Sequence, residues 1–327
     1  MNKKISIITP TLNQGSFIEE CILSVLNQNY DNLEFIVIDG GSDDGTLNIL
    51  EKYKKHFSYY ISEPDKGQSD AINKGLKLAT GEIINWLNSD DYLEPGSLQM
   101  INSAFQDNSV NIFSGRSNII RDGHVTKHSS GLDVYENNLA KTIAWARIDQ
   151  PETYWRKTVI DEIGSLNNVL HYIMDRDWWV KYLFKYDLEG ILQSDKIITN
   201  FRLHEDSKTV SSTDDFNVER NKYFAGIIKN SKIEFPLNLV GDITLESILD
   251  LPHSTNDQLT HGIANYFFML LATEKYEESN FKLFRGLYNQ INKDFLAKED
   301  ALHLNKLYSR SNILPEGFHR IIKRIRA

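Results

Sequence analysis

The amino-acid sequence predicts an α/β protein with a mixed sheet flanked by helices, followed by a small helical C-terminal region. Over residues 1–110, short β-branched runs alternate with helical patterns, which is typical of βαβ units wound into a parallel sheet. From residue 217 onward glycines are rarer and helical patterns dominate, for example over 263–271 and 281–287. The composition, with 41% hydrophobic and 25% charged residues, is that of an ordinary globular chain that can bury a core.

The first predicted crossover connects a strand at 5–11 to a second strand at 33–38. Between them, one face of a helix that begins near residue 17 carries the apolar residues Ile18, Cys21, Ile22, Val25 and Leu26. Cys21 is the only cysteine, so no internal disulfide can form, and we expect it to be a buried apolar side chain in a reducing cytoplasm. A third strand is predicted at 58–62.

A buried strand at 82–87 leads directly into an acidic motif, Asn88-Ser89-Asp90-Asp91. The helix predicted before it, over 68–80, carries small and apolar side chains on one face and ends at Gly81. The strand is nearly all apolar, which indicates burial on both faces of the sheet. Because α/β proteins bind ligands at the carboxyl ends of such strands, the acidic motif is in a ligand position.

Beyond this motif the pattern indicates strands of mixed direction. A helix that ends near residue 105 precedes a strand at 111–120, and Asp122-Gly123 is typical of a hairpin turn. A further strand is predicted near 196–202. We therefore expect one domain over 1–216, whose two halves divide near residue 110, and a helical region over 217–327.

Charge and hydropathy exclude several classes of partner. Lys and Arg number 36 and Asp and Glu number 45, and the resulting net charge of −9 would repel nucleic acid. The chain enters a strand without a signal stretch, and no apolar run is long enough to cross a bilayer, so a cytoplasmic protein is expected. Residues 318–327 interleave apolar and basic side chains, which favours either weak peripheral contact with the cytoplasmic membrane or a final docked helix.

The acidic motif has two interpretations. Adjacent carboxylates at Asp90 and Asp91 suit a hard divalent cation that also holds a diphosphate, because such a cation binds oxygen ligands and neutralises phosphate charge. The alternative is that both acids cap the helix that follows Pro95. The remaining motifs favour the first interpretation.

Four motifs resemble those of family 2 glycosyltransferases in order and spacing: IITPT at 7–11, DGGSDDGT at 39–46, DKGQSDA at 65–71 and NSDD at 88–91. The resemblance covers roughly the first two-thirds of the chain. It implies a GT-A fold, a nucleotide-diphosphate sugar donor, which we expect to be a UDP-sugar, a Mn²⁺ or Mg²⁺ ion, and inversion at the anomeric carbon. The family's usual bacterial setting is surface polysaccharide or lipopolysaccharide assembly, with a saccharide or lipid-linked saccharide as acceptor.

The same resemblance assigns the donor side of the site to the half over residues 1–110. The residues that would lie along the nucleotide are Thr9, Pro10, Thr11 and Asn13. Asp39 would hydrogen-bond the base or ribose, unless it only forms the turn that follows it. Asp65 and Gln68 would flank the base, or else cap the helix that begins at residue 68. Asp90 would contact the ribose or diphosphate, and Asp91 would be the metal ligand.

The half over residues 111–216 resembles the acceptor side of the family, where a helix opens with an acidic pair whose second acid is the base. Here Met174 replaces the first acid, and Asp175 keeps the second and is the expected base. Acids two positions apart on a helix point about 200° away from each other, so only one of Asp175 and Asp177 can face the site. Asp175 shares a face with Trp178, an apolar neighbour that would raise the proton affinity of the Asp175 carboxylate. Asp177 would instead form a surface ion pair with Lys181.

Three further assignments follow from the resemblance. Trp155 and Trp178 would face the acceptor sugar, or alternatively belong to the core. The stretch that contains Arg202, His204 and Lys208 resembles the family's closing Arg-x-His loop. His204 would complete the metal shell or touch the diphosphate, and Arg202 and Lys208 would offset phosphate charge.

Two other functions fit the sequence less well. A nucleotidyltransferase would need a Gly-rich basic loop after the first strand, but residues 10–15 contain no lysine or arginine. A catalytically inactive nucleotide-sugar-binding protein or scaffold would have no need of Asp91 and Asp175, which are both present. We therefore predict a metal-dependent, inverting glycosyltransferase.

Overall fold

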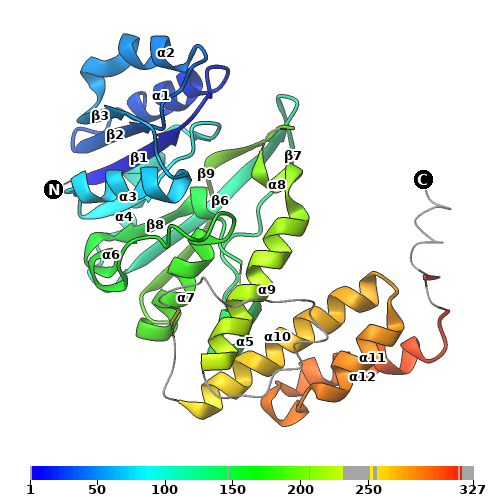
Figure 1. Cartoon of the computed structure of the whole chain (residues 1–327). Helices are drawn as coiled ribbons and strands as arrows, with labels where there is room; N and C mark the ends of the chain where they lie inside the picture. The colour runs from blue at the N-terminus through cyan, green and yellow to red at the C-terminus, as the bar shows by residue number, and fades with distance from the viewer. Residues whose placement is uncertain are drawn as a thin grey trace. The chain divides into compact units, whose positions relative to one another are not determined.

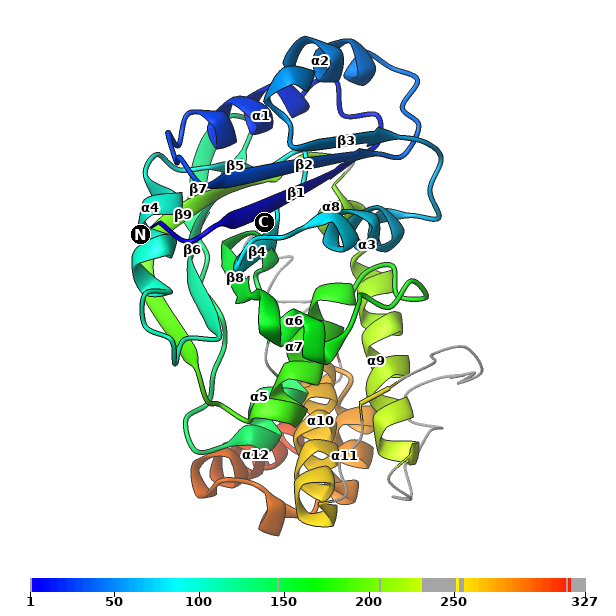
Figure 2. The same ribbon diagram turned by 90° about the vertical axis from the view of Figure 1, so that its left-hand side faces the viewer.

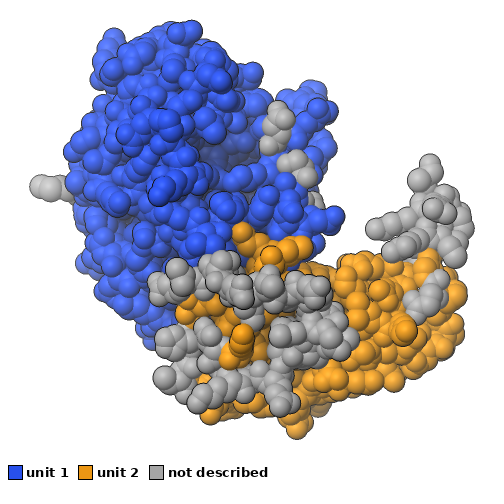
Figure 3. All heavy atoms as spheres, viewed as in Figure 1, with its two compact units in different colours: residues 1–133, 147–217 blue, residues 134–146, 218–327 orange. Residues whose placement is uncertain are grey.

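The computed structural model of the chain describes residues 2–145, 147–205, 207–230, 251–252, 256–315 and 317–318. The chain forms two compact units, coloured in Figure 3. Unit 1 contains residues 1–133 and 147–217, and unit 2 contains residues 134–146 and 218–327. Residues 134–146, which fall in the second half of the expected domain, are thus grouped with the C-terminal helices.

Unit 1 is built on a mixed sheet that has nine strands in the described residues, in the order β3-β2-β1-β4-β8-β6-β9-β5, with β7 paired to β6 (Figure 1). The strands are β1 (Ile5–Thr11), β2 (Leu33–Asp39), β3 (Tyr59–Ser62), β4 (Ile83–Trp86), β5 (Tyr92–Leu93), β6 (Ile112–Arg121), β7 (His124–His128), β8 (Thr153–Arg156) and β9 (Ile191–Leu203). The first four strands are parallel, and β8 is antiparallel to both of its neighbours. The predicted α/β fold with a mixed sheet is confirmed.

The described helices of unit 1 are α1 (Ile18–Leu26), α2 (Thr46–Tyr53), α3 (Gln68–Leu78), α4 (Ser97–Ala104), α6 (Lys157–Ile163), α7 (Met174–Tyr186) and α8 (Lys208–Ser211). The helices α1 and α2 cover one face of the parallel strands, and α3 covers the other (Figure 2). A Cβ atom on Gly75 of α3 would lie 2.4 Å from Cγ2 of Ile8, so the glycine lets this helix pack closely on β1.

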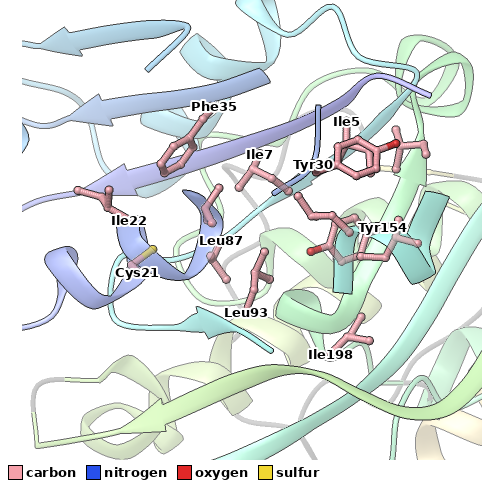
Figure 4. Packing of buried hydrophobic residues seen from close by; sticks show 14 of the residues in the cluster. Ile5, Ile7, Cys21, Ile22, Tyr30, Phe35, Leu87, Leu93, Tyr154 and Ile198 are labelled. Carbon is pink, nitrogen blue, oxygen red and sulfur yellow. The ribbon is translucent and has the colours of Figure 1, made fainter. Parts of the chain in front are cut away.

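The core between α1 and the sheet follows the predicted apolar pattern. Ile18, Cys21, Ile22 and Val25 of α1 are buried, as the helical stripe predicted. Figure 4 shows Cys21 and Ile22 beside side chains of β1 and β2 and the labelled residues Leu87 and Leu93. Leu87 follows β4, so the same core supports the backbone that leads into the acidic motif.

Three features of the sheet differ from the prediction. The strands β5 and β8 were not predicted, and β9 begins at residue 191 rather than near 196. Strand β5 has two residues and β8 has four, too few to show a period, and both are specified by pairing with strands distant in sequence.

Unit 2 contains α5 (Leu139–Trp145), α10 (Asp257–Glu277), α11 (Phe281–Gln290) and α12 (Lys298–Ser311), and α9 (Thr213–Asn230) runs from unit 1 into unit 2. Trp145 Nε1 of α5 donates to the carbonyl of Tyr266 on α10 at 2.6 Å, and Lys141 of α5 pairs with Asp300 of α12 at 2.7 Å. Within the described residues, no helix is both long and apolar enough to span a membrane. Residues 319–327, most of the segment predicted to contact a membrane, lie outside the described residues.

Candidate donor and acceptor site

The residues predicted to bind the donor lie at the carboxyl ends of three neighbouring parallel strands. Strand β1 ends at Thr11 and β2 at Asp39, and these two residues are paired in register. Strand β4 ends at Trp86, which pairs with Ile8, and the acidic motif follows it. The structure therefore brings the predicted donor residues of three strands to one edge of the sheet, where α/β proteins bind ligands.

The residues of β1 differ in what they present to this edge. Thr9 and Pro10 are buried within the strand, and Thr9 Oγ1 lies 4.0 Å from Sγ of Cys21 on α1. Thr11 is 5% exposed, and its Oγ1 has no hydrogen-bond partner among the described residues. A buried hydroxyl without a hydrogen-bond partner is uncommon. Thr11 is therefore the β1 residue best placed to form a hydrogen bond with a ligand or water.

Asn13 joins two loops at the edge of the sheet. Its backbone N–H donates to Oγ of Ser42 at 2.8 Å, and its Oδ1 accepts from the N–H of Asp43 at 2.9 Å. Asn13 has a φ of 53°, a left-handed conformation that Asn tolerates better than most residues. Its side chain therefore shapes the predicted nucleotide loop by holding it against the loop after β2.

Asp39 is fully buried and forms the turn after β2. Its Oδ2 accepts from the N–H groups of Gly41 and Ser42, both at 3.1 Å, and from Oγ of Ser62 at 2.6 Å. Its Oδ1 accepts from Oγ of Ser42 at 2.5 Å. The structure thus supports the turn-forming interpretation, because the protein already supplies four donors to this carboxylate.

Asp65 and Gln68 lie beside the ends of β2 and β4. A Cβ atom on Gly40 would lie 2.6 Å from Oδ2 of Asp65, so a glycine is needed for this carboxylate to approach the backbone. Gln68 Nε2 donates to Oδ1 of Asn88 at 2.8 Å, which connects α3 to the acidic motif. The N-cap of α3 is Gly67, so neither Asp65 nor Gln68 occupies the capping position.

The two acids of the motif have different surroundings. Asp90 is partly exposed, and its Oδ2 lies 3.1 Å from Nε2 of His204. Asp91 is 1% exposed, and its Oδ1 accepts from the backbone N–H of Arg202 at 2.9 Å. The helix-cap alternative is wrong, because the N-cap of α4 is Gly96, which makes no side-chain cap bond.

Burial and the adjacent Asp90 carboxylate raise the pKa of Asp91 well above its ordinary value, since both disfavour the ionised form of Asp91. A divalent cation would remove this penalty. Among the described residues, no three His, Cys, Asp or Glu side chains are arranged to hold a metal ion by themselves. The oxygen-rich donor set therefore fits a cation that takes its remaining ligands from a diphosphate and water, as Mg²⁺ commonly does.

Arg202 and Lys208 serve different parts of the site. The guanidinium of Arg202 donates to Glu20 at 2.7 Å and lies over the ring of Phe17, so it is directed toward α1, and its backbone rather than its side chain meets the acidic motif. Lys208 Nζ donates to Oε1 of Gln68 at 3.0 Å and to the carbonyl of His171 at 3.1 Å. Lys208 thus places a cation beside the start of α3.

The predicted acceptor side includes the first turn of α7. Asp175 is partly buried, and burial raises its pKa to about 6, with the charge of Asp149 adding to the shift. Asp177 is fully buried and pairs with Lys181 at 2.9 Å. The predicted pairing of Asp177 is confirmed, but the pair is buried and not on the helix surface as expected.

Trp155 and Trp178 lie in the core. Each is 1% exposed, and their ring centroids are 5.6 Å apart. Neither ring is available to stack on a sugar, which matches the core interpretation of these residues and corrects the expectation that they face the acceptor. Trp178 lies three positions further along α7 than Asp175, so these two residues share a face of the helix.

The turn at Gln150–Glu152, which precedes β8, contains buried polar residues that were not among the predicted site residues. Glu152 is fully buried, its Oε2 accepts from Oγ of Ser129 at 2.6 Å, and burial together with Asp149 raises its pKa to about 7. Gln150 donates to the backbone of β4. The polar residues on either side of Pro151 were the only sequence indication of these contacts.

Two solved structures share the fold. The crystal structure of S. aureus TarS 1-349 in complex with UDP-GlcNAc has a TM-score of 0.61 at 18% identity, and the match covers 99% of this chain and 91% of that chain. The mannosyltransferase PcManGT from Pyrobaculum calidifontis, in complex with GDP-Man and Mn²⁺, has a TM-score of 0.51 at 16% identity, covering 95% and 87%. At these identities the likeness shows the fold, and the chain has a GT-A-like α/β architecture.

Sequence comparison points to a family for the N-terminal half. The model described as Glycosyl transferase family 2 matches residues 6–161, and this segment is similar to that family. It is 35% identical over 135 residues to the chondroitin synthase of Escherichia coli, covering 40% of this chain and 20% of that protein. It is 32% identical over 132 residues to the GalNAc(5)-diNAcBac-PP-undecaprenol beta-1,3-glucosyltransferase of Campylobacter jejuni, covering 39% and 42%. The chain thus spans less than half the length of these two relatives.

Proposed function

We propose that the chain transfers a sugar from a UDP-sugar to a hydroxyl of a saccharide or lipid-linked saccharide, with inversion at the anomeric carbon. The observation that carries the proposal is a pair of acidic groups on separate elements. Asp90 and Asp91 follow β4, and Asp175 opens α7 with a pKa of about 6. Asp90 and Asp91 can hold a cation that offsets the charge of a departing diphosphate, and Asp175 can act as a general base.

In this proposal residues 1–110 bind the nucleotide, residues 111–216 bind the acceptor, and residues 217–327 form an accessory helical region. Asp91, Asp90 and His204 would hold a Mn²⁺ or Mg²⁺ ion together with phosphate oxygens and water. When bound, the cation supplies positive charge that stabilises the departing diphosphate. The backbone N–H of Arg202 orients the carboxylate of Asp91. Lys208, which donates to Gln68, would add positive charge on the donor side of the site.

Asp175 would accept the proton of the acceptor hydroxyl while that oxygen forms a bond to the anomeric carbon. The bond from this carbon to the diphosphate oxygen breaks, and its electron pair leaves with UDP. Attack from the side opposite the leaving group inverts the anomeric centre. A pKa of about 6 leaves Asp175 ionised at neutral pH and yet more basic than an ordinary Asp.

The names of the two relatives support a glycan acceptor. One is a chondroitin synthase, and the other is named for an undecaprenol-linked acceptor. We therefore place the reaction in the assembly of a bacterial surface polysaccharide or lipopolysaccharide.

Thermal-shift measurements with UDP-, GDP- and dTDP-sugars, with and without Mn²⁺, test the donor assignment, because a ligand that binds only the folded state raises the melting temperature. We expect a UDP-sugar to give the largest shift and only with metal. A parallel assay of UDP release separates an enzyme from an inactive sugar-nucleotide-binding scaffold, which would show the shift without turnover. Equal shifts with and without metal would contradict the proposed site.

A further inference from the structure

The turn that contains Gln150 is clamped to the strand that carries the acidic motif. Gln150 is 6% exposed, and its Nε2 donates to Oδ1 of Asn85 at 2.8 Å and to the carbonyl of Trp86 at 2.5 Å. Asn85 in turn donates through Nδ2 to the carbonyl of Pro151 at 3.2 Å. These four residues, Asn85, Trp86, Gln150 and Pro151, form what we term the amide clamp.

The chemistry of the clamp fixes the orientation of both amides. The backbone carbonyls of Trp86 and Pro151 can only accept hydrogen bonds, so the NH₂ groups of Gln150 and Asn85 must face them. Both N–H bonds of Gln150 are then used, one on each acceptor. A side chain without two such donors cannot reproduce the clamp.

Trp86 connects the two acidic groups of the proposed site. It lies on β4 four residues before Asp90, and its ring centroid is 5.5 Å from that of Trp178 on α7. Trp178 follows Asp175 by three positions and so lies on the same face of the helix. The backbone of Trp86 therefore leads to the acidic motif, while its ring supports the helix that carries Asp175.

We propose that Gln150 is a positioning residue for sugar transfer. By holding the end of β4 through Trp86, it fixes the distance between the acidic motif and Asp175. This inference rests on the proposed function, since it concerns the geometry in which donor and acceptor meet. Such geometry matters because a misplacement of about 1 Å costs on the order of 100-fold in rate.

Two substitutions of Gln150 test this role. Gln150→Met keeps the length and bulk of the side chain but removes both donors, and we expect kcat to fall about 10- to 100-fold while UDP affinity stays unchanged. Gln150→Glu places a carboxylate against two acceptor oxygens, and regains one donor when protonated. The ratio of its kcat to that of the parent should rise as pH falls, whereas the ratio for Gln150→Met should stay constant.

Asn265→Ala serves as the matched control in unit 2. Asn265 is also a buried amide, which donates to the carbonyl of His261 at 2.8 Å and accepts from the N–H of Asn292 at 2.7 Å. We expect it to lower the melting temperature with kcat unchanged. A Gln150→Met enzyme with the parent kcat, a kcat loss accompanied by equal loss of UDP affinity, or a Gln150→Glu ratio that is flat with pH would overturn the inference. A parent protein that transfers no sugar would instead contradict the proposed function.

Discussion

At the scale of single residues, the first turn of α7 gives two nearby acids different environments. Asp177 is fully buried and paired with Lys181 at 2.9 Å, so its charge is already matched. Asp175 is partly exposed, and burial raises its pKa to about 6, although the adjacent Arg176 acts in the opposite direction. We therefore assign proton transfer to Asp175 as part of the proposed function, and we expect Asp177 to stabilise the helix.

Replacing Asp175 with Asn keeps the shape of the side chain and removes its basicity. We expect kcat for sugar transfer to fall ~10²- to 10⁴-fold with UDP affinity largely intact, as is typical when a general base is lost. The control is Asp177→Asn, which should lower the melting temperature and cost much less in rate. Full activity of Asp175→Asn, or a rate loss confined to Asp177→Asn, would show that the wrong acid has been assigned.

The raised pKa of Asp175 also sets a pH dependence. Only the ionised carboxylate can accept a proton, and its pKa is about 6, so activity is retained above this pH and lost as pH falls through it. Below that point kcat should fall about tenfold per pH unit. Initial rates at saturating donor and acceptor between pH 5 and 8 measure this, at intervals of about half a unit. A parent profile that stays flat through pH 6, or the same acid limb in Asp175→Asn, would rule out this titration.

At the scale of elements, the close packing of α3 on β1 links stability to donor binding. A Cβ atom on Gly75 would lie 2.4 Å from Cγ2 of Ile8, and α3 begins at Gln68, which bonds to the acidic motif. Gly75→Ala should therefore destabilise the protein by about 1–3 kcal/mol, the usual cost of overpacking, and raise KM for the donor. Urea unfolding measures the first effect. Ile8→Ala alone should cost about 2–5 kcal/mol, and the double variant should lose less than the sum of the two single losses, because the added Cβ atom then has space. A Gly75→Ala protein as stable as the parent would contradict this packing.

The elements also show what the sequence could and could not reveal. Strands β1 to β4 and helices α1 and α3 were predicted, because the spacing of their apolar residues is visible in the local sequence alone. Strand β8 was missed because its four residues are specified by partners on β4 and β6. The same reason applies to the site. The acidic motif adjoins a recognisable strand, but the contact of Gln150 with Trp86 joins residues 64 positions apart and leaves no local pattern.

At the scale of the whole molecule, unit 2 is held by a polar network that is separate from the acids of the site. Lys141 and Asp300 are 13% and 12% exposed and lie 2.7 Å apart, and Tyr266 also donates to Asp300 at 3.1 Å. Lys141→Met would leave Asp300 buried without its cation, at a cost of up to about 3–5 kcal/mol in unfolding free energy. The double variant with Asp300→Leu should recover much of this. UDP affinity should stay at the parent value throughout, and its loss would show that unit 2 takes part in donor binding.

The terminal segment, residues 318–327, gives a further test at this scale. Its alternation of basic and apolar residues predicts weak binding to an anionic membrane surface, with docking as a final helix as the alternative. Sedimentation with anionic liposomes compares the full chain with a variant that lacks these residues. Equal sedimentation of the two proteins would favour the docked helix.

The proposed role of the acidic motif is tested by the rate of sugar transfer from a UDP-sugar, measured against Mn²⁺ concentration for the parent and for Asp91→Ala. The parent should transfer sugar only with the metal, because Asp91 is a buried carboxylate beside a second acid. Asp91→Ala should show no turnover at any metal concentration that supports the parent. Transfer by Asp91→Ala at the parent rate with metal present would contradict the central claim that this motif binds the donor through a cation.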